Sequence, residues 1–383
     1  MTSRNLSILG LVAVLAVVAG VWLAGRQTSM PATQSAELYP DLKQELDAVT
    51  AVRIVKAGGS PAVELKRAEG GWTVAERSGF PADEAKLRKL LTSLAEAKVI
   101  EEKTSNPESY PTLGVEDISN DGAGGMQLEI EGPKQPVKLI VGKQASGASS
   151  HYVRRADEPK SWLINKSLDT SSSADQWLRK SIIDVSADRV QSAEVKIGNA
   201  KPYTAVKKTR ADAEFAVEGL PKGKELSSPS AADNFASALS GLTLSDVQPA
   251  NTMTDKPGAQ TTIKTFDGLV AEATGWKTDD KYYVALKTSY DAAQAEKYKV
   301  ATAAAEQEDP ADANKQADDK DAAATDSEGA PPAADKPAEE AKPARNVEEE
   351  ATKANAQLTG WVFEIPAYKY DAIFKPMDEL IKK

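Results

Sequence analysis

The sequence predicts an α+β protein of two related modules behind an N-terminal transmembrane helix. Runs with strand character outnumber helical runs, and they do not alternate with helices as a parallel βαβ sheet requires. The order of these runs in the first half of the chain recurs in the second half. The 383 residues are enough for two ordinary domains. Each module is expected to hold a mostly antiparallel sheet with one amphipathic helix packed on it.

The chain divides into four parts by composition and pattern. They are an N-terminal membrane anchor (1–26), a polar spacer (27–44), a first α+β module (45–185) and a second α+β module (186–383). An acidic, Ala- and Pro-rich segment (291–357) interrupts the second module.

Leu6–Ala24 is a run of 19 residues without a charge, rich in Leu, Val and Ala. As a helix it would be roughly 28 Å long, close to the hydrocarbon thickness of a bilayer. Trp22 lies near its end, where an indole ring prefers the interface. A cleaved signal peptide is the alternative, but the run is long and lacks a good small-x-small cleavage site. We favour an uncleaved anchor with a cytoplasmic N-terminus, which places the rest of the chain outside the cytosol.

The first module begins with strand character at 49–56, followed by strand pieces at 63–67 and 71–74. A helix comes next, because Asp83 can cap its start and leucines recur at i, i+3, i+4 and i+7 (Leu87, Leu90, Leu91 and Leu94). Strands are then expected at 126–130, 137–141, 152–154 and 162–164, and a polar helix containing Trp177 and Leu178 closes the module.

The second module repeats this order with weaker sequence identity. Its opening strand at 190–197 corresponds to the strand at 49–56, and Phe215 occupies the position that corresponds to Trp72. A helix capped by Ser230 is expected to carry Phe235, Leu239 and Leu242 on one face. Four strands follow, at 261–266, 269–274, 281–287 and 361–365. The last of them corresponds to the strand at 162–164. A short amphipathic helix at 370–381 ends the chain.

One interval differs between the halves. Tyr152 precedes Trp162 by 10 residues, whereas Tyr283 precedes Trp361 by 78. Most of the difference is the stretch 301–357, which has 15 acidic and 6 basic residues, 19 alanines and one valine, and carries nearly all of the formal net charge of −10. So few apolar side chains cannot offset the entropy of ordering the chain. We predict a disordered loop that serves spacing or solubility, with partner binding as the alternative.

No residue set in the sequence indicates a catalytic centre. The chain has no Cys, which excludes disulfides, thiolate metal sites and a cysteine nucleophile. His151 is the one histidine, and neither Ser149 nor Ser150 before it lies in a nucleophile-elbow sequence. We interpret His151 as a strand-edge residue without a mechanistic role.

Three further patterns have structural explanations. The carboxylate pairs Asp83–Glu84, Glu101–Glu102 and Glu129 with Glu131 could suggest a glycosidase, but Asp83 is a helix cap and Glu129 and Glu131 share one strand face. Gly122–Gly125 lacks the Lys and Ser/Thr of a phosphate loop and indicates a hairpin connection. Trp72, Trp162 and Trp361 lie in strands and are expected to pack the cores. We assign no catalytic, cofactor-binding or metal-binding residue.

Several motifs resemble the bacterial domain-of-unknown-function 4340 family. They are Gly71-Trp72-Thr73-Val74, Ala82-Asp83-Glu84-Ala85-Lys86, Leu113-Gly114-Val115, Leu139-Ile140-Val141-Gly142-Lys143 and Asp175-Gln176-Trp177-Leu178-Arg179-Lys180. The resemblance covers about residues 45 to 190 and fades in the second half. It implies a membrane-anchored envelope protein, often associated with ABC-type transport components like those of the gliding-motility system. It supplies no catalytic residues, and the acidic segment departs from the family pattern.

These observations favour a single-pass, envelope-facing interaction protein that serves an ABC-type transport system as an accessory subunit. Its expected partners are the membrane and other membrane proteins, and no basic face favours nucleic acid. No catalysis is expected. A wall-directed hydrolase that uses carboxylates is one alternative. A passive ligand-binding or structural envelope module, with its site in the groove between the halves, is another.

Overall fold

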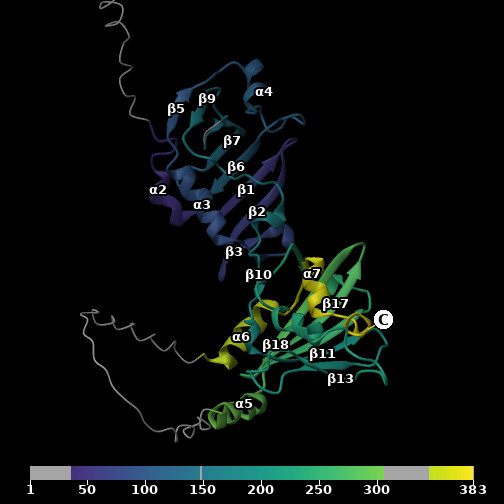
Figure 1. Ribbon diagram of the computed structural model, residues 1–383. Coiled ribbons are helices and arrows are strands. Elements are labelled where there is room, and N and C mark those ends of the chain that lie inside the picture. The colour runs from purple at the N-terminus through teal and green to yellow at the C-terminus, as the bar shows by residue number, and fades with distance from the viewer. Residues whose placement is uncertain (1–35, 147–148, 306–344, 383) are drawn as a thin grey trace, which may run out of the picture. The chain divides into compact units, whose positions relative to one another are not determined.

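The computed structural model describes residues 36–146, 149–305 and 345–382 (Figure 1). The chain divides after Arg179 into two compact units. Each unit combines one large antiparallel sheet with short helices, so the predicted α+β class is confirmed.

The predicted anchor at 1–26 lies outside these residues. Within the ranges described, no helix is both long enough and apolar enough to cross a membrane.

The sheet of the first unit has nine strands in the order β4-β3-β2-β1-β6-β7-β8-β9-β5. Alternate residues of the central strand β1 face the core, where Val52 and Ile54 are buried, while Arg53 lies on the opposite face. The strands are β1 (Ala51–Lys56), β2 (Ser60–Ala68), β3 (Gly71–Val74), β4 (Phe80–Pro81), β5 (Val99–Glu102), β6 (Met126–Glu131), β7 (Val137–Gln144), β8 (His151–Arg155) and β9 (Ser161–Ile164).

The helix α3 (Glu84–Ala95) follows β4 as predicted. The Asp83 side chain accepts a hydrogen bond from the Lys86 backbone N–H at 3.0 Å, and the four leucines of the periodic stripe are buried. The shorter helices of the unit are α2 (Leu42–Glu45), η1 (Leu46–Ala48), η2 (Ala75–Arg77), η3 (Pro107–Ser109), α4 (Tyr110–Leu113) and η4 (Ala174–Trp177). The last replaces the predicted polar helix: it is a single 3₁₀ turn whose Trp177 is fully buried.

The sheet of the second unit has eight strands in the order β13-β12-β11-β16-β17-β18-β19-β15. They are β11 (Val190–Ile197), β12 (Tyr203–Val206), β13 (Ala216–Glu218), β15 (Asp246–Pro249), β16 (Ala259–Thr265), β17 (Leu269–Thr278), β18 (Lys281–Tyr290) and β19 (Trp361–Ile365). A separate pair, β10 (Ser181–Ile183) and β14 (Leu242–Thr243), also belongs to this unit.

The two large sheets share one strand order. The strands β3, β2, β1, β6, β7, β8, β9 and β5 of the first sheet occupy the same successive places as β13, β12, β11, β16, β17, β18, β19 and β15 of the second. Thus β11, at 190–197, is the topological counterpart of β1, and β19 is that of β9.

Both predicted helices of the second unit differ in the structure. The helix expected after Ser230 is the 3₁₀ helix η6 (Pro229–Ser237), and Leu242 lies beyond it in β14. The C-terminal helix is divided into α7 (Ala367–Ile373) and α8 (Met377–Leu380), because Pro376 lacks the N–H that a continuous helix needs. Two further 3₁₀ turns are η5 (Ala187–Arg189) and η7 (Ala250–Thr252).

The prediction of a disordered segment over 291–357 is wrong at both of its edges. Helix α5 (Ala292–Ala305) follows β18, and helix α6 (Val347–Leu358) precedes β19. The Thr288 hydroxyl donates to the Ala351 carbonyl at 2.7 Å, and Val347, Ala351 and Leu358 are buried. A few apolar side chains at helical spacing are therefore enough to dock α6 against β18, despite the polar composition around them.

Candidate functional site

The carboxylates that could have suggested a glycosidase are held by neighbouring groups. Glu129 and Glu131 share one face of β6, as predicted, and both lie beside Arg53, whose Nε also donates to Glu64 at 2.6 Å. Glu101 and Glu102 contact Lys103 and Lys160, respectively. These ion pairs explain the acids as structural groups on the sheet surface.

His151 begins β8, where the sequence placed a strand-edge residue. Its Nδ1 accepts a hydrogen bond from the Leu168 backbone N–H at 3.1 Å. Burial lowers the pKa of His151 below its ordinary value, while a backbone hydrogen bond with Lys166 opposes this shift. The histidine is therefore neutral at pH 7 and ties the segment after β9 to the start of β8.

Gly122–Gly125 is not a hairpin connection. The segment leads from α4 into β6, and its last glycine packs against backbone atoms of Gly114 and Val141. Gly142 approaches Leu113 and Gly114 in the same way. These glycines let the Leu113-Gly114-Val115 segment cross the sheet closely, beside a small apolar cluster of Tyr110, Val115 and Ile140.

The tryptophan prediction holds for one of its three residues. Trp162 is buried, but Trp72 and Trp361 are only partly buried on their strands. Trp177, which the sequence placed on a polar helix, is fully buried instead, and its indole N–H donates to the Ser171 carbonyl at 2.9 Å.

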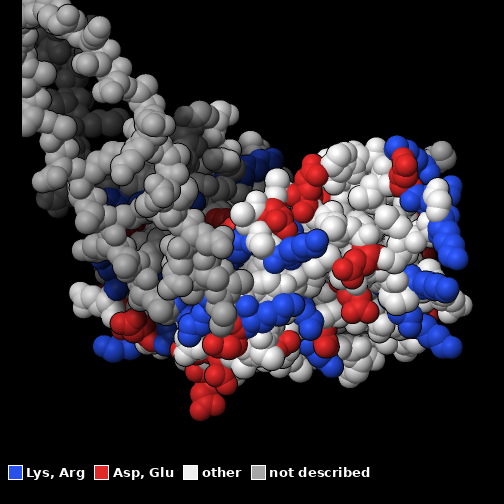
Figure 2. All heavy atoms as spheres, turned by 60° about the horizontal axis from the view of Figure 1, so that its bottom comes forward, with Lys and Arg blue, Asp and Glu red and all other residues white. Residues whose placement is uncertain are grey.

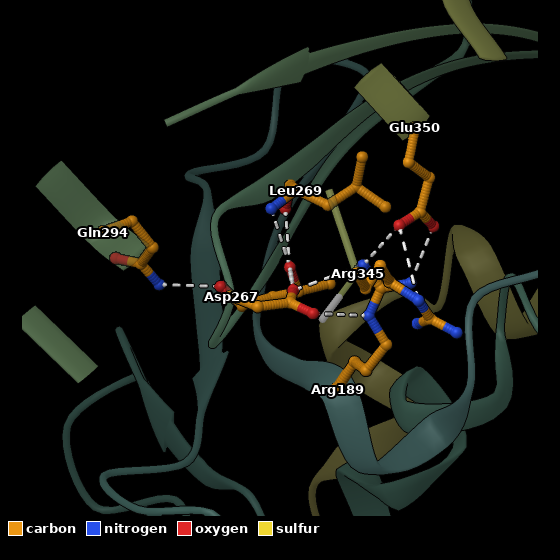
Figure 3. A network of polar contacts seen from close by, with 7 residues as sticks. Arg189, Asp267, Leu269, Gln294, Arg345 and Glu350 are labelled. Carbon is orange, nitrogen blue, oxygen red and sulfur yellow. Dashed lines mark hydrogen bonds and ion pairs between the residues drawn. The ribbon is translucent and has the colours of Figure 1, made fainter. Parts of the chain in front are cut away.

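A buried polar network of the second unit is built around Arg189, at the end of η5. Figure 3 shows its guanidinium lying between Asp267, in the turn from β16 to β17, and Glu350 of α6. Arg189 Nε donates to Asp267 at 2.8 Å, and its Nη1 donates to Glu350 at 2.7 Å. Arg189 Nη2 donates a second bond to Asp267 at 3.3 Å and another to Glu350 at 3.1 Å, so both contacts are bidentate.

Burial and ion pairing act in opposite directions in this network. Burial lowers the pKa of Arg189, whose side chain is 4% exposed, but the bonds from Glu350 and Asp267 outweigh it and hold the pKa above its ordinary value. Burial likewise raises the pKa of Asp267, yet the hydrogen bonds from Thr265 and Arg189 bring it below its usual range. Arg189 and Asp267 are therefore both charged at neutral pH.

A cavity of about 620 Å³ adjoins this network. Its walls carry three cations (Arg210, Lys299 and Arg345), three aromatic rings (Phe266, Tyr290 and Tyr298) and the acidic residues Asp267 and Glu348. Arg345 Nε lies 3.8 Å from Glu350, which extends the network to the cavity rim. The volume and the mixture of apolar and charged walls are those of a small-molecule site.

Sequence reasoning missed this site for a physical reason. Asp267 and Glu350 are 78 and 161 residues from Arg189 in the chain, so no local spacing joins them. Glu350 and Arg345 also fell inside the segment predicted to be disordered. The one available signal was Val347, the single valine of the stretch 301–357, which is buried at the start of α6.

Charge elsewhere on the visible surface is mixed in sign, and Figure 2 shows Lys and Arg interspersed with Asp and Glu. Among the residues described, no group of three or more His, Asp or Glu side chains is arranged to hold a metal ion.

These features define an α+β protein with two large antiparallel sheets and a cation-rimmed cavity beside a buried ion-pair network. Residues 72–262 match the family described as Domain of unknown function (DUF4340), so this part of the chain belongs to that family, as the motifs indicated. The match begins at Trp72, later than the resemblance suggested, and continues into the second unit. No curated protein and no solved structure matches the chain.

Proposed function

We propose that this protein is a single-pass, membrane-anchored envelope protein that binds other membrane proteins as an accessory subunit. The observation that carries the proposal is the uncharged run Leu6–Ala24, whose 19 residues suit one crossing of the bilayer. The bulk of the chain then lies on the extracytoplasmic side, and a subunit of an ABC-type transport system is the expected partner. Membership of residues 72–262 in the DUF4340 family supports this proposal.

We further propose that the two units are related modules that arose by duplication. The shared strand order of the two sheets supports this relationship, as does the sequence echo between β1 and β11. A duplicated scaffold presents two similar sheets on one chain, which suits a protein that organises partners.

Membrane attachment is tested by fractionation of the full chain. We expect it to stay with membranes after washing at high salt and at alkaline pH. Leu15→Arg adds a charge to the middle of the run, which costs about 2.5–3.5 kcal/mol for insertion of a helix, and should release part of the protein. Gln27→Arg, in the spacer outside the run, is the matched control. Leu42→Arg also lies outside the run but would not serve, because Leu42 is buried. Recovery of the unaltered chain in the soluble fraction would refute the anchor.

Orientation and partners need separate measurements. An alkaline phosphatase fusion after Lys43 should be active, and an inactive but stable fusion would contradict the extracytoplasmic assignment. Cross-linking in intact membranes, followed by identification of the attached chains, should recover transport subunits. Repeated recovery of the protein alone, with its attachment to membranes intact, would refute the accessory role without affecting the anchor.

A ligand-binding envelope module is the second candidate function. The cavity beside Arg189 favours it, because its rings and cations converge on one space of about 620 Å³.

A further inference from the structure

The cavity beside Arg189 gathers cations from three separate segments of the chain. Arg210 follows β12, Lys299 belongs to α5, and Arg345 lies two residues before α6. Two of the three are arginines, whose planar guanidinium can donate two parallel hydrogen bonds to a phosphate or carboxylate. This arrangement favours an anionic ligand group.

Aromatic rings lie beside those cations in the cavity wall, where Tyr290 is 37% exposed and Phe266 is 2% exposed. The Phe266 and Tyr298 rings meet edge to face, with their centroids 4.9 Å apart. The Arg210 guanidinium carbon lies 5.2 Å from the Phe266 ring centroid. Phe266 is thus covered by its neighbours, and a planar ligand ring could lie against the partly exposed Tyr290 and Tyr298 rings while its charged group reaches the arginines.

The network and the cavity lining together carry a formal charge of +1, from four cations (Arg189, Arg210, Lys299 and Arg345) and three carboxylates (Asp267, Glu348 and Glu350). Asp267 lines the cavity, but its carboxylate is bonded to Arg189 and to the Thr265 hydroxyl. Glu350 is likewise bonded to Arg189. Glu348 is the remaining acidic residue of the lining, and Arg345 lies 3.8 Å from Glu350. The Asn346 side chain occupies the Glu349 backbone N–H at the start of α6, so the cations carry the attraction rather than the helix end.

We propose that this cavity binds a small organic anion in which a phosphate or carboxylate is attached to a flat ring. The volume of about 620 Å³ is within the usual range for small-molecule sites. The inference stands on the cavity alone and does not rest on the proposed membrane role.

Phenyl phosphate and benzoate are suitable probes, measured by calorimetry on the full chain in detergent. Inorganic phosphate, which lacks the ring, and benzylamine, which reverses the charge, are the comparison compounds. We expect at least one anionic probe to bind about tenfold more tightly than both comparison compounds, and to weaken as salt is raised. The phosphate and carboxylate arms show which anion the site prefers.

Arg210→Gln and Arg345→Gln should each lower the affinity for the preferred probe about tenfold, because each removes one charge-assisted contact. Lys222→Gln, an exposed cation of the same unit outside the cavity lining, is the matched control and should leave binding unchanged. Circular dichroism identifies any variant that fails to fold, and the other arginine variant then carries the test. Equal affinity for benzylamine, equal loss in Lys222→Gln, or no binding of either anionic probe would overturn the proposal.

Discussion

Gly142 and Gly125 show how a missing Cβ can determine packing in the first unit. A Cβ on Gly142 would lie 2.8 Å from both the Gly114 carbonyl oxygen and Val115 Cγ1, and a Cβ on Gly125 would lie 2.7 Å from the Val141 carbonyl oxygen. Both distances are far inside van der Waals contact. The segment around Gly114 can therefore approach β7 only because these positions carry no side chain.

Gly142→Ala should lower the free energy of unfolding by about 1–3 kcal/mol, because the backbone must move to admit the methyl group. Gly122→Ala is the matched control: it lies in the preceding loop, and an added Cβ meets nothing within 4 Å. Urea denaturation compares the two variants with the unaltered chain. Equal stability of both variants would contradict the packing argument.

His151 gives a second test at the level of one side chain. His151→Phe leaves the Leu168 N–H without its acceptor and should cost about 1–3 kcal/mol. His151→Asn keeps an acceptor oxygen and should cost less. If the two variants lose equal stability, the hydrogen bond is not the reason for the loss.

The same histidine should make the free energy of unfolding depend on pH. Its pKa is lowered in the fold by burial, so the neutral form is favoured there relative to the unfolded chain, whose pKa is near 6.5. Its contribution is therefore present above that value and is lost as the pH falls through the lowered pKa. The stability difference between the unaltered chain and His151→Asn should shrink between about pH 8 and about pH 5. A difference that stays constant over this range would refute the assignment.

The sequence predicts features that depend on neighbouring residues, and it does not predict features that depend on residues far apart in the chain. Asp83 and the leucines of α3 act within one helix, so their spacing predicts both the cap and the buried face. Trp177 was misjudged because polar neighbours suggested an exposed helix, whereas its burial depends on contacts made elsewhere in the fold. Arg189 has a similar explanation, since one partner lies in the turn between β16 and β17 and the other lies in α6, both far away in the chain.

At the scale of elements, α6 shows the limit of judging order from composition. Three acidic residues in its first turn complement the helix dipole, and the Asn346 side chain caps its N-terminus. The apolar stripe of Val347, Ala351 and Leu358 then packs inward. The average composition of the surrounding segment obscured this stripe, because alanine counts weakly as an apolar signal.

Arg189→Met should release α6 from the turn between β16 and β17. The substitution leaves the partly buried Asp267 and Glu350 carboxylates without their shared cation, which should cost about 3 kcal/mol. Arg345→Met is the control, since its side chain is 58% exposed and such a pair contributes less than about 1 kcal/mol. Hydrogen exchange should accelerate across residues 345–358 in the first variant and stay unchanged in the second. Similar exchange in both would show that the network does not hold the helix.

For the whole molecule, the order of strand and helix signals predicted the α+β class because it depends only on local patterns. The positions of most strands in both halves were also predictable, since alternation marks a sheet with one buried face. Strand order within each sheet was not, because pairing between β5 and β9 or between β15 and β19 joins segments far apart in the chain.

The division of the chain into two compact units leads to a prediction about cooperativity. Each unit has its own buried aromatic core residues, including Phe80 in the first and Phe235 in the second. Phe235→Ala should cost about 3–5 kcal/mol through loss of burial and the cavity left behind. If each unit is stabilised by its own core, Phe235→Ala should destabilise residues 180–382 alone. Phe80→Ala should destabilise residues 36–179 alone. Hydrogen exchange followed by peptide mass analysis separates the two regions in one experiment, and each variant serves as the control for the other. Faster exchange in both regions of both variants would mean that the units unfold together.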